Sequence, residues 1–243
     1  IKFLFFEGKM RALFSLLFGA SLVLFIERAD AAGRFGDRLQ LRRLCWLALF
    51  GLAHFYLFWW GDILFLYAIS GLVALLLQSM GTRTLLIAAL PIFLFWHAAG
   101  AAESYPDVAI EDRVVQGTAS EAESRSYSAY RAILVSNAEQ DMRNVSGSFV
   151  SQMSIRTQED MFLPLLTALM TMAETLPLMM IGMALMRSGF FSGEWPRLRL
   201  LWIGGLGTAT GLALTAAMLG WLWPRGFPPR AMEAAYLYAG ALP

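Results

Sequence analysis

Charged residues are scarce in this chain: they make up 15% of its 243 residues, whereas hydrophobic residues make up 58%. A typical soluble domain is about 25% charged, so lipid must be the solvent for much of this chain. The formal net charge is only +1, and no basic patch interleaved with aromatic residues appears. We therefore do not expect a nucleic acid as a partner.

Several motifs are also missing. Cys45 is the single cysteine, which excludes an intrachain disulfide. The sequence has no metal-ligand spacing, no Walker phosphate loop and no Ser-His-Asp order. We therefore predict no metal site and no bound cofactor.

Hydrophobic runs long enough to cross a bilayer recur along the chain. A bilayer core about 30 Å thick needs roughly 20 mostly apolar residues in a helix. Two such runs carry one charge each, Arg11 in 10–26 and Glu174 in 161–186, and a last run begins near Met232. Four more carry no charged residue: 44–61, 63–82, 84–102 and 200–224. We predict an all-α polytopic transmembrane helix bundle with six complete spans plus the start of a seventh. Because the sequence begins with Ile and ends within an apolar run, we expect it to be an interior part of a longer chain.

The basic residues are divided unevenly between the two ends of these runs, and short cytoplasmic loops are typically rich in Lys and Arg. Five basic residues would lie on one side: Lys2, Lys9, Arg11, Arg225 and Arg230. Nine would lie on the other: Arg28, Arg34, Arg38, Arg42, Arg43, Arg83, Arg187, Arg197 and Arg199. This bias predicts that loops 27–43 and 187–199 are cytoplasmic and that segment 102–160 is extracytoplasmic.

The chain divides into three regions. Residues 1–101 hold the first four spans, 102–160 form a polar segment, and 161–243 hold spans five and six and the start of the seventh. The polar segment has ten acidic and five basic residues between Glu103 and Asp160. Its apolar residues recur at helical intervals, which predicts one or two amphipathic helices: Tyr127, Tyr130, Leu134, Met142, Val145, Phe149 and Met153. Such helices would either cap the outer ends of the bundle or form a lid over a substrate cleft.

Charges enter the first span in the run Glu7-Gly8-Lys9-Met10-Arg11. A charge at the centre of a membrane helix costs roughly 2.5–3.5 kcal/mol on insertion scales, so each one indicates a function or a partner. Glu7 and Arg11 are four residues apart and can pair on one helical face. Alternatively, the charges lie at the interface and set the depth of the helix.

His54 lies among aromatic residues about two turns below the outer surface. Desolvation favours its neutral form, which a general base needs; alternatively, it is a buried histidine that hydrogen-bonds to a neighbouring helix. Asp62 is eight residues farther on, so a direct contact with His54 requires a break in the helix at Gly61. Asp62 could instead be the N-cap of the third span.

Glu174 lies near the middle of the fifth span, three residues before Pro177, whose missing amide loosens the helix. It is a candidate substrate-binding or proton-binding group, or, when protonated, a hydrogen-bond donor to another helix. His97, near the outer end of the fourth span, is expected to be interfacial. With this topology six polar residues lie toward the outer side, which predicts a polar cavity that opens outward: Glu7, Lys9, Arg11, His54, Asp62 and His97.

Small and aromatic residues in the spans favour structural roles. Gly207 and Gly211 form a G-x-x-x-G pair, which predicts a helix contact in the sixth span. Trp59 and Trp60 are expected to belong to an interfacial aromatic belt.

Three segments resemble the signature segments of YeiB-like bacterial membrane proteins. The first is FEGKMRALFSLLFGA, from Phe6 to Ala20, and the second runs from His54 to Tyr67 through WGDIL. The third is GMALMRSG, residues 182–189. Together these segments are distributed over most of the chain.

The resemblance implies a bacterial inner-membrane protein. The YeiB-like family is described mainly by a domain of unknown function and is similar, at a distance, to membrane acyltransferases. Those enzymes pass acyl groups from a cytoplasmic thioester to glycans or other acceptors across the bilayer. The resemblance implies for His54 the role of their membrane-embedded histidine, and it leaves the roles of Glu7, Lys9, Arg11 and Asp62 open.

Our leading hypothesis is an acyltransferase-like protein that uses acyl-CoA or a similar thioester as donor and a glycan or small polar acceptor at the outer side. His54 would remove a proton from the acceptor hydroxyl or transiently hold the acyl group, and Asp62 would orient His54. The acceptor would be bound by Glu7, Lys9, Arg11 and Glu174. The alternative is a proton-coupled transporter or exporter of a small polar metabolite. A third hypothesis is a structural or sensory subunit.

Overall fold

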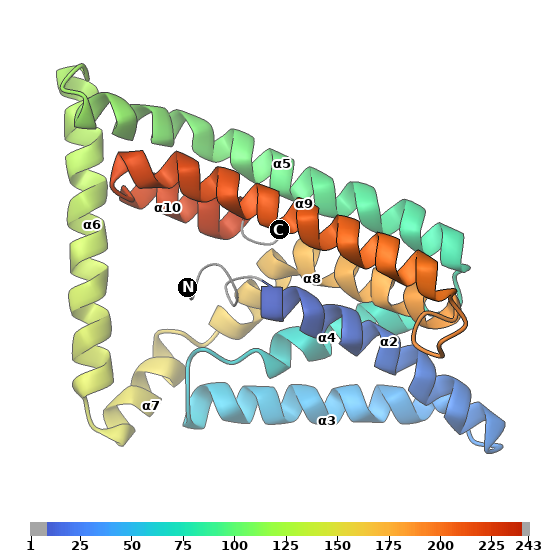
Figure 1. The fold of residues 1–243 in the computed structure, drawn as a ribbon. Coiled ribbons are helices and arrows are strands. Elements are labelled where there is room, and N and C mark those ends of the chain that lie inside the picture. Colours follow the sequence, from blue (N-terminus) through green and yellow to red (C-terminus); the bar gives the residue numbers. More distant parts are fainter. Residues whose placement is uncertain (1–8, 240–243) are drawn as a thin grey trace.

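The computed structural model describes residues 9–239, and every regular element among them is helical (Figure 1). The elements are α2 (Lys9–Ala31), α3 (Gly36–Leu57), α4 (Leu64–Leu76), α5 (Thr82–Val115), α6 (Glu121–Ser146), α7 (Phe149–Gln158), α8 (Leu163–Arg187), α9 (Arg197–Leu222), the 3-10 turn η1 (Trp223–Arg225), α10 (Pro229–Ala234) and the π-helical turn η2 (Ala235–Ala239). The predicted all-α class is confirmed.

Four helices are long and apolar enough to cross a membrane: Met10–Ala31, Thr82–Val115, Leu163–Arg187 and Arg197–Arg225. They correspond to the first, fourth, fifth and sixth predicted spans. The second and third predicted spans form α3 and α4. α4 has only 13 residues, about 20 Å of helix, and α3 has four charged residues among its first eight. The predicted count of six complete spans is therefore not confirmed.

α5 is longer than a bilayer core requires. Its 34 residues extend for about 51 Å, with Pro91 and Pro106 inside the helix. The helix continues without a break through residue 102, where the sequence predicts the polar segment to begin. One or two helices are predicted for that segment, and two are observed, α6 and α7.

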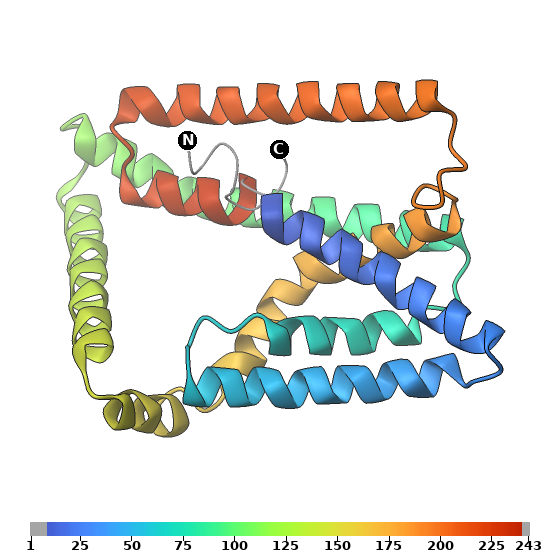
Figure 2. The ribbon, with the colours of Figure 1, turned by 60° about the horizontal axis from the view of Figure 1, so that its bottom comes forward.

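Three turns at one end of the molecule are flanked by helix ends that carry many of the chain's arginines, among them Arg28, Arg38, Arg83, Arg187 and Arg197. Figures 1 and 2 show turns 32–35, 77–81 and 188–196 at the right-hand end, whereas turn 58–63, α6 and α7 lie at the left-hand end. The long helices therefore alternate in direction. This arrangement agrees with the two sides that the arginine bias predicts.

α2 and α8 cross in the core through two glycines. A Cβ on Gly19 would overlap the carbonyl oxygen of Met179, and a Cβ on Gly182 would overlap that of Leu16. The two backbones are therefore in direct contact, which only glycine allows. Apolar side chains of the central core include Leu22, Val23, Tyr67, Met180 and Met183.

α9 is the most exposed of the four long helices. A Cβ on Gly207 would meet nothing within 4 Å, so the helix contact predicted at this residue is wrong for the part of the chain that the structure describes. α9 packs instead through Met218 and Leu222, which join a small cluster with Val108 of α5 and Ala231 of α10. Gly211, the other glycine of the predicted pair, is buried. Close glycine contacts lie in other helices, as at Gly19 and Gly182, and at Gly51 of α3, where a Cβ would overlap the backbone of Phe65.

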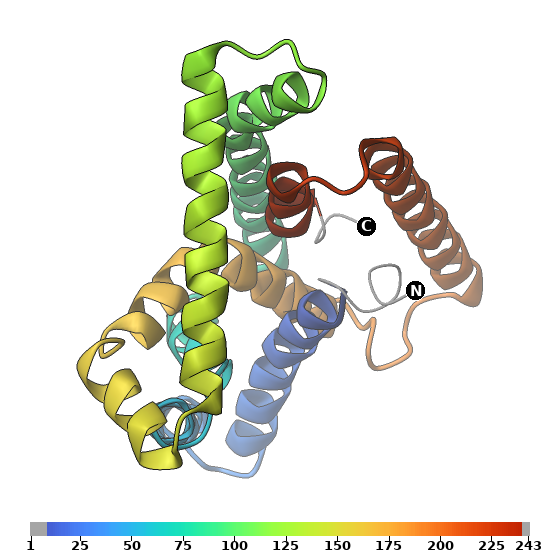
Figure 3. The ribbon, with the colours of Figure 1, turned by 90° about the vertical axis from the view of Figure 1, so that its left-hand side faces the viewer.

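α6 stands across one end of the bundle (Figure 3). Its N-terminus is a capping box, in which Ser120 and Glu123 bond each other's backbone amides. Arg113 donates to Glu123, and this bond and the bonds from Ser120 lower the pKa of Glu123 from 4.5 to about 2. Tyr130 donates to Glu233 at 2.9 Å, and burial together with this carboxylate raises the pKa of Tyr130 to about 12.

Glu111 joins three helices at the same end. This fully buried carboxylate of α5 accepts the backbone N–H groups of Arg230 and Ala231 at 3.0 and 2.9 Å, and the hydroxyl of Tyr127 at 3.0 Å. A carboxylate is favourable at a helix N-terminus. Glu111 therefore fixes the start of α10 and, through α10, the position of η2.

Candidate functional site

His54 and Asp62 are in direct contact where α3 ends and α4 begins. Nδ1 of His54 lies 2.9 Å from Oδ1 of Asp62. Along a straight helix eight residues would span about 12 Å. The contact exists because α3 ends at Leu57, before Gly61, and residues 58–63 turn the chain back.

Asp62 has a second partner. Its Oδ2 accepts the backbone N–H of Phe65 in the first turn of α4, at 2.9 Å. The Asp62 side chain is 2% exposed and that of His54 is 38% exposed. One buried carboxylate therefore both contacts the histidine and caps the helix, the two alternatives that the sequence leaves open.

The contact determines which nitrogen of His54 accepts a proton. An ionised carboxylate has no hydrogen to donate, so we assign the proton of the neutral ring to Nδ1, which leaves the lone pair on Nε2. Phe58 stacks on the ring at 6.2 Å between centroids, and Trp59 meets it edge-on at 6.4 Å. These contacts hold the orientation of a partly exposed imidazole that can act as a base.

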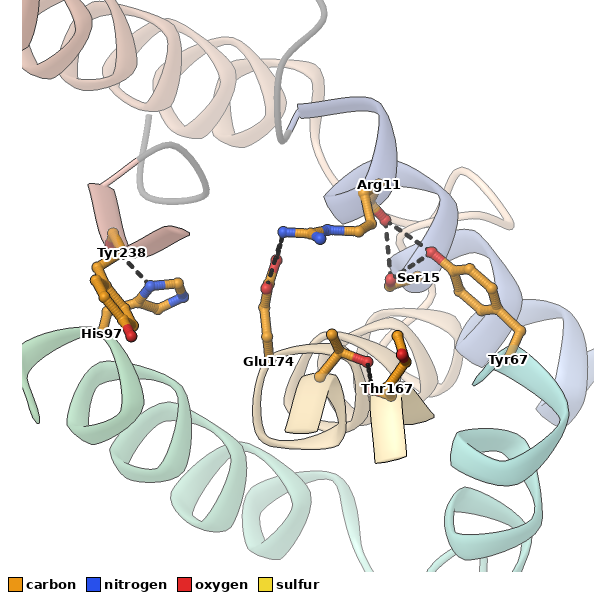
Figure 4. A network of polar contacts seen from close by, with 8 residues as sticks. Arg11, Ser15, Tyr67, His97, Thr167, Glu174 and Tyr238 are labelled. Atoms are coloured by element: carbon orange, nitrogen blue, oxygen red, sulfur yellow. Dashed lines mark hydrogen bonds and ion pairs between the residues drawn. The ribbon is translucent and has the colours of Figure 1, made fainter. Parts of the chain in front are cut away.

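A second polar cluster lies where α2, α4, α5 and α8 approach one another (Figure 4). Nη2 of Arg11 donates to both carboxylate oxygens of Glu174, at 2.8 and 2.9 Å. The Glu174 side chain is 6% exposed and that of Arg11 is 34% exposed. The predicted partner of Arg11, Glu7, lies outside the described residues, as does the side chain of Lys9.

Ser15 and Tyr67 connect α4 to the same turn of α2. The hydroxyl of Ser15 donates to the carbonyl oxygen of Arg11 at 2.8 Å. The Tyr67 hydroxyl lies 3.0 Å from Ser15 Oγ and donates to the same carbonyl at 3.2 Å. Both side chains are fully or almost fully buried. They fix the turn that positions the guanidinium of Arg11.

His97 lies near this cluster in Figure 4, and its predicted interfacial position stays a prediction. It is buried, and its Nδ1 lies 2.8 Å from the carbonyl oxygen of Tyr238 in η2. That oxygen can only accept, so Nδ1 donates and Nε2 carries the lone pair of the neutral ring. Nε2 has no hydrogen-bond partner among the described residues, and the ring faces Glu174 in Figure 4.

The predicted site residues thus form two groups. No hydrogen bond or ion pair joins the His54–Asp62 pair to the Arg11–Glu174 cluster within residues 9–239. The sequence could suggest Glu174 and Arg11 individually, but helix spacing rules identify partners only within one helix. In the same range, no group of three His, Cys, Asp or Glu side chains could hold a metal ion.

Two curated bacterial proteins are similar to part of this chain. It is 44% identical over 92 residues to the uncharacterized protein YxaH of Bacillus subtilis (strain 168). The aligned segment covers 38% of this chain and 23% of YxaH. It is 45% identical over 76 residues to an uncharacterized 39.9 kDa protein in the amylase 3' region of Bacillus acidopullulyticus. This second aligned segment covers 30% of this chain and 22% of that protein. The similarity therefore spans less than a quarter of either relative's length. No family model and no solved structure matches the chain.

Proposed function

We propose that this chain is part of a membrane acyltransferase in which His54, oriented by Asp62, activates the hydroxyl group of a polar acceptor. The 2.9 Å contact between His54 Nδ1 and Asp62 Oδ1 carries the proposal. A carboxylate that only capped α4 would need one oxygen for the Phe65 amide, whereas the second oxygen of Asp62 is directed at the imidazole. Pairing with a buried carboxylate makes a histidine a stronger base.

In the proposed reaction, His54 Nε2 takes the proton of the acceptor hydroxyl while the hydroxyl oxygen bonds to the carbonyl carbon of an acyl thioester. The C–S bond of the resulting tetrahedral intermediate then breaks, and the leaving sulfur takes the proton back from the imidazolium. The products are an ester and a free thiol, and His54 returns to its neutral form. Asp62 stabilises the imidazolium between the two proton transfers.

We further propose that the bundle lies in a bacterial inner membrane with α6 and α7 outside. In this arrangement the α3–α4 hairpin supplies two further spans, of 22 and 13 residues, which gives the six spans that the sequence predicts. The arginines of the helix ends beside turns 32–35, 77–81 and 188–196, which lie at one end of the bundle, support this orientation. An impermeant maleimide should label Ser128→Cys in a Cys45→Ser background from outside intact spheroplasts; labelling only after lysis would reverse the orientation.

Thioester turnover by the purified full-length protein tests the proposed chemistry. Release of free thiol from acetyl-CoA, with water in place of the acceptor, should fall by about 10²–10⁴-fold in His54→Ala. In Asp62→Asn the amide still offers an oxygen to Phe65, but it does not hold the imidazolium, so turnover should fall by up to about 10⁴-fold. Thermal unfolding of each variant serves as the folding control. Unchanged turnover in a folded His54→Ala protein would remove His54 from this role.

The Arg11–Glu174 cluster favours a second candidate function, proton-coupled transport of a small polar metabolite. A charged pair inside a helix bundle, beside a buried histidine with a free lone pair, is typical of proton relays in transporters. In reconstituted vesicles, uptake of a labelled metabolite from a panel of small polar compounds should collapse with the proton gradient and be lost in Glu174→Gln. Uptake that is insensitive to both changes would exclude this function.

A further inference from the structure

A cavity lies between the turn after α3 and the helices α6 and α7, and its wall includes Trp60, two residues before Asp62. It leaves about 90 Å³ for the centres of water molecules, which is room for about six of them. Its walls combine apolar side chains with charged and polar ones: Trp60, Val145 and Ile155 on the one hand, and Asp141, Gln152, Arg156 and Asp160 on the other. A space of this size accommodates a single six-membered ring with its substituents.

Arg156 is the most deeply buried of these residues. Its Nε donates to the carbonyl oxygen of Gln152 at 3.0 Å, and its Nη1 to that of Phe55 at 3.5 Å. The residue is 5% exposed, and its Nη2 is buried without a hydrogen-bond partner among the described residues. An unmet donor on a buried charge is costly. Because Arg156 lines the cavity, a ligand oxygen bound there is a candidate partner for this donor.

The charges on the walls select the kind of ligand. Asp141 and Asp160 together outweigh the single charge of Arg156, so phosphates and carboxylates are repelled. Carboxylates only accept hydrogen bonds, whereas a guanidinium only donates them, so the complementary group must do both. Hydroxyl groups have this property. The exposed ring of Trp60 offers a flat apolar face for the C–H groups of such a ligand.

Residues that line the cavity contact the residues that flank or touch His54. The bond from Arg156 ends on the carbonyl of Phe55, next to His54, and Trp60 meets Trp59 at 6.3 Å, which in turn meets His54. We propose that this cavity binds the acceptor, and that the acceptor is a neutral polyhydroxyl compound such as a sugar. The assignment of an acceptor rests on the proposed transfer at His54, but binding of the compound does not.

Saturation-transfer NMR with the full-length protein in nanodiscs tests the proposal without a thioester. The probes are methyl β-D-glucopyranoside, which is neutral, glucose 6-phosphate, an anion, and glucosamine, a cation. We expect transfer to the neutral glycoside, with a drop of at least about tenfold in affinity, about 1.4 kcal/mol, in Trp60→Ala and in Asp160→Asn. Transfer to the phosphate should be absent.

Two matched variants serve as controls. Trp202→Ala removes an exposed tryptophan on α9, and Glu139→Gln removes a carboxylate of α6 two residues before Asp141; both should bind like the unmodified protein. No transfer to the glycoside, transfer that survives Trp60→Ala and Asp160→Asn, or a preference for the phosphate or the amine would overturn the proposal. If the glycoside binds but thioester turnover does not depend on His54, only the proposed chemistry is contradicted. If turnover depends on His54 but the glycoside does not bind, only the acceptor site is contradicted.

Discussion

Replacing Gly182 by alanine tests the helix crossing that brings Arg11 and Glu174 together. The added Cβ would lie far inside the 3.0 Å limit of real Cβ contacts, against the backbone carbonyl of Leu16. Because a backbone cannot rotate away, α2 and α8 must separate by roughly 1 Å. Such overpacking costs about 1–3 kcal/mol.

The separation also acts on the ion pair next to the crossing. Both bonds from Arg11 to Glu174 are short, at 2.8 and 2.9 Å, and would lengthen. A hydrogen bond to a charged group contributes about 1.5–3 kcal/mol. With both effects we expect Gly182→Ala to lower the free energy of unfolding by about 2.5–6 kcal/mol, measured by SDS titration in mixed micelles with tryptophan fluorescence.

Gly207→Ala is the matched control, since the Cβ it adds on α9 meets nothing within 4 Å. Alanine in an open helical position stabilises by about 0.5–1 kcal/mol relative to glycine. Gly182→Ala should therefore unfold at a much lower SDS fraction than Gly207→Ala. Equal midpoints, or the reverse order, would refute the crossing and would favour α9 as the principal contact helix.

Two further predictions concern ion pairs. Glu174→Gln leaves the buried part of Arg11 with a weaker partner. Loss of one member of a buried pair costs about 3–5 kcal/mol, and the 34% exposure of Arg11 reduces the expected loss of stability to about 1–3 kcal/mol. An unchanged midpoint in the same SDS titration would contradict the pairing. Glu123 should titrate near pH 2 by carboxyl ¹³C NMR, and Arg113→Gln should move its pKa back toward 4.5. Because the pKa of Glu123 is lower in the folded state, its contribution to stability is present above about pH 4.5 and is lost as the pH falls toward 2. An NMR titration midpoint of Glu123 that does not change in Arg113→Gln would contradict this account.

The apolar runs predict the long helices well, because a run of some 20 uncharged residues has few alternatives to a membrane helix. They fail for α3 and α4. There the uncharged run 44–61 includes a turn that belongs to no helix, and the charged residues before Leu44 belong to α3. Composition marks where lipid can be the solvent, but it does not mark where a helix begins or ends.

The candidate sites depend on distances between helices, which the sequence does not contain. The contact between His54 and Asp62 could be anticipated as an option, since both residues flank one turn. The partnership of Arg11 with Glu174 joins residues 163 positions apart, and the burial of His97 depends on η2, near the end of the described residues. The sequence does not predict the cavity at Arg156, because a single arginine in a polar amphipathic segment is expected to lie on the surface.

The two histidines of the chain offer the most direct test of the central claim, because one is paired with Asp62 and the other lies near the Arg11–Glu174 cluster. Thiol release from acetyl-CoA should be measured for the full-length protein, His54→Ala and His97→Ala under the same conditions. The proposed chemistry predicts that His54→Ala loses turnover by about 10²–10⁴-fold, whereas a folded His97→Ala protein keeps most of it. Turnover that survives in His54→Ala, or that is lost only in His97→Ala, would contradict the assignment of His54 as the base.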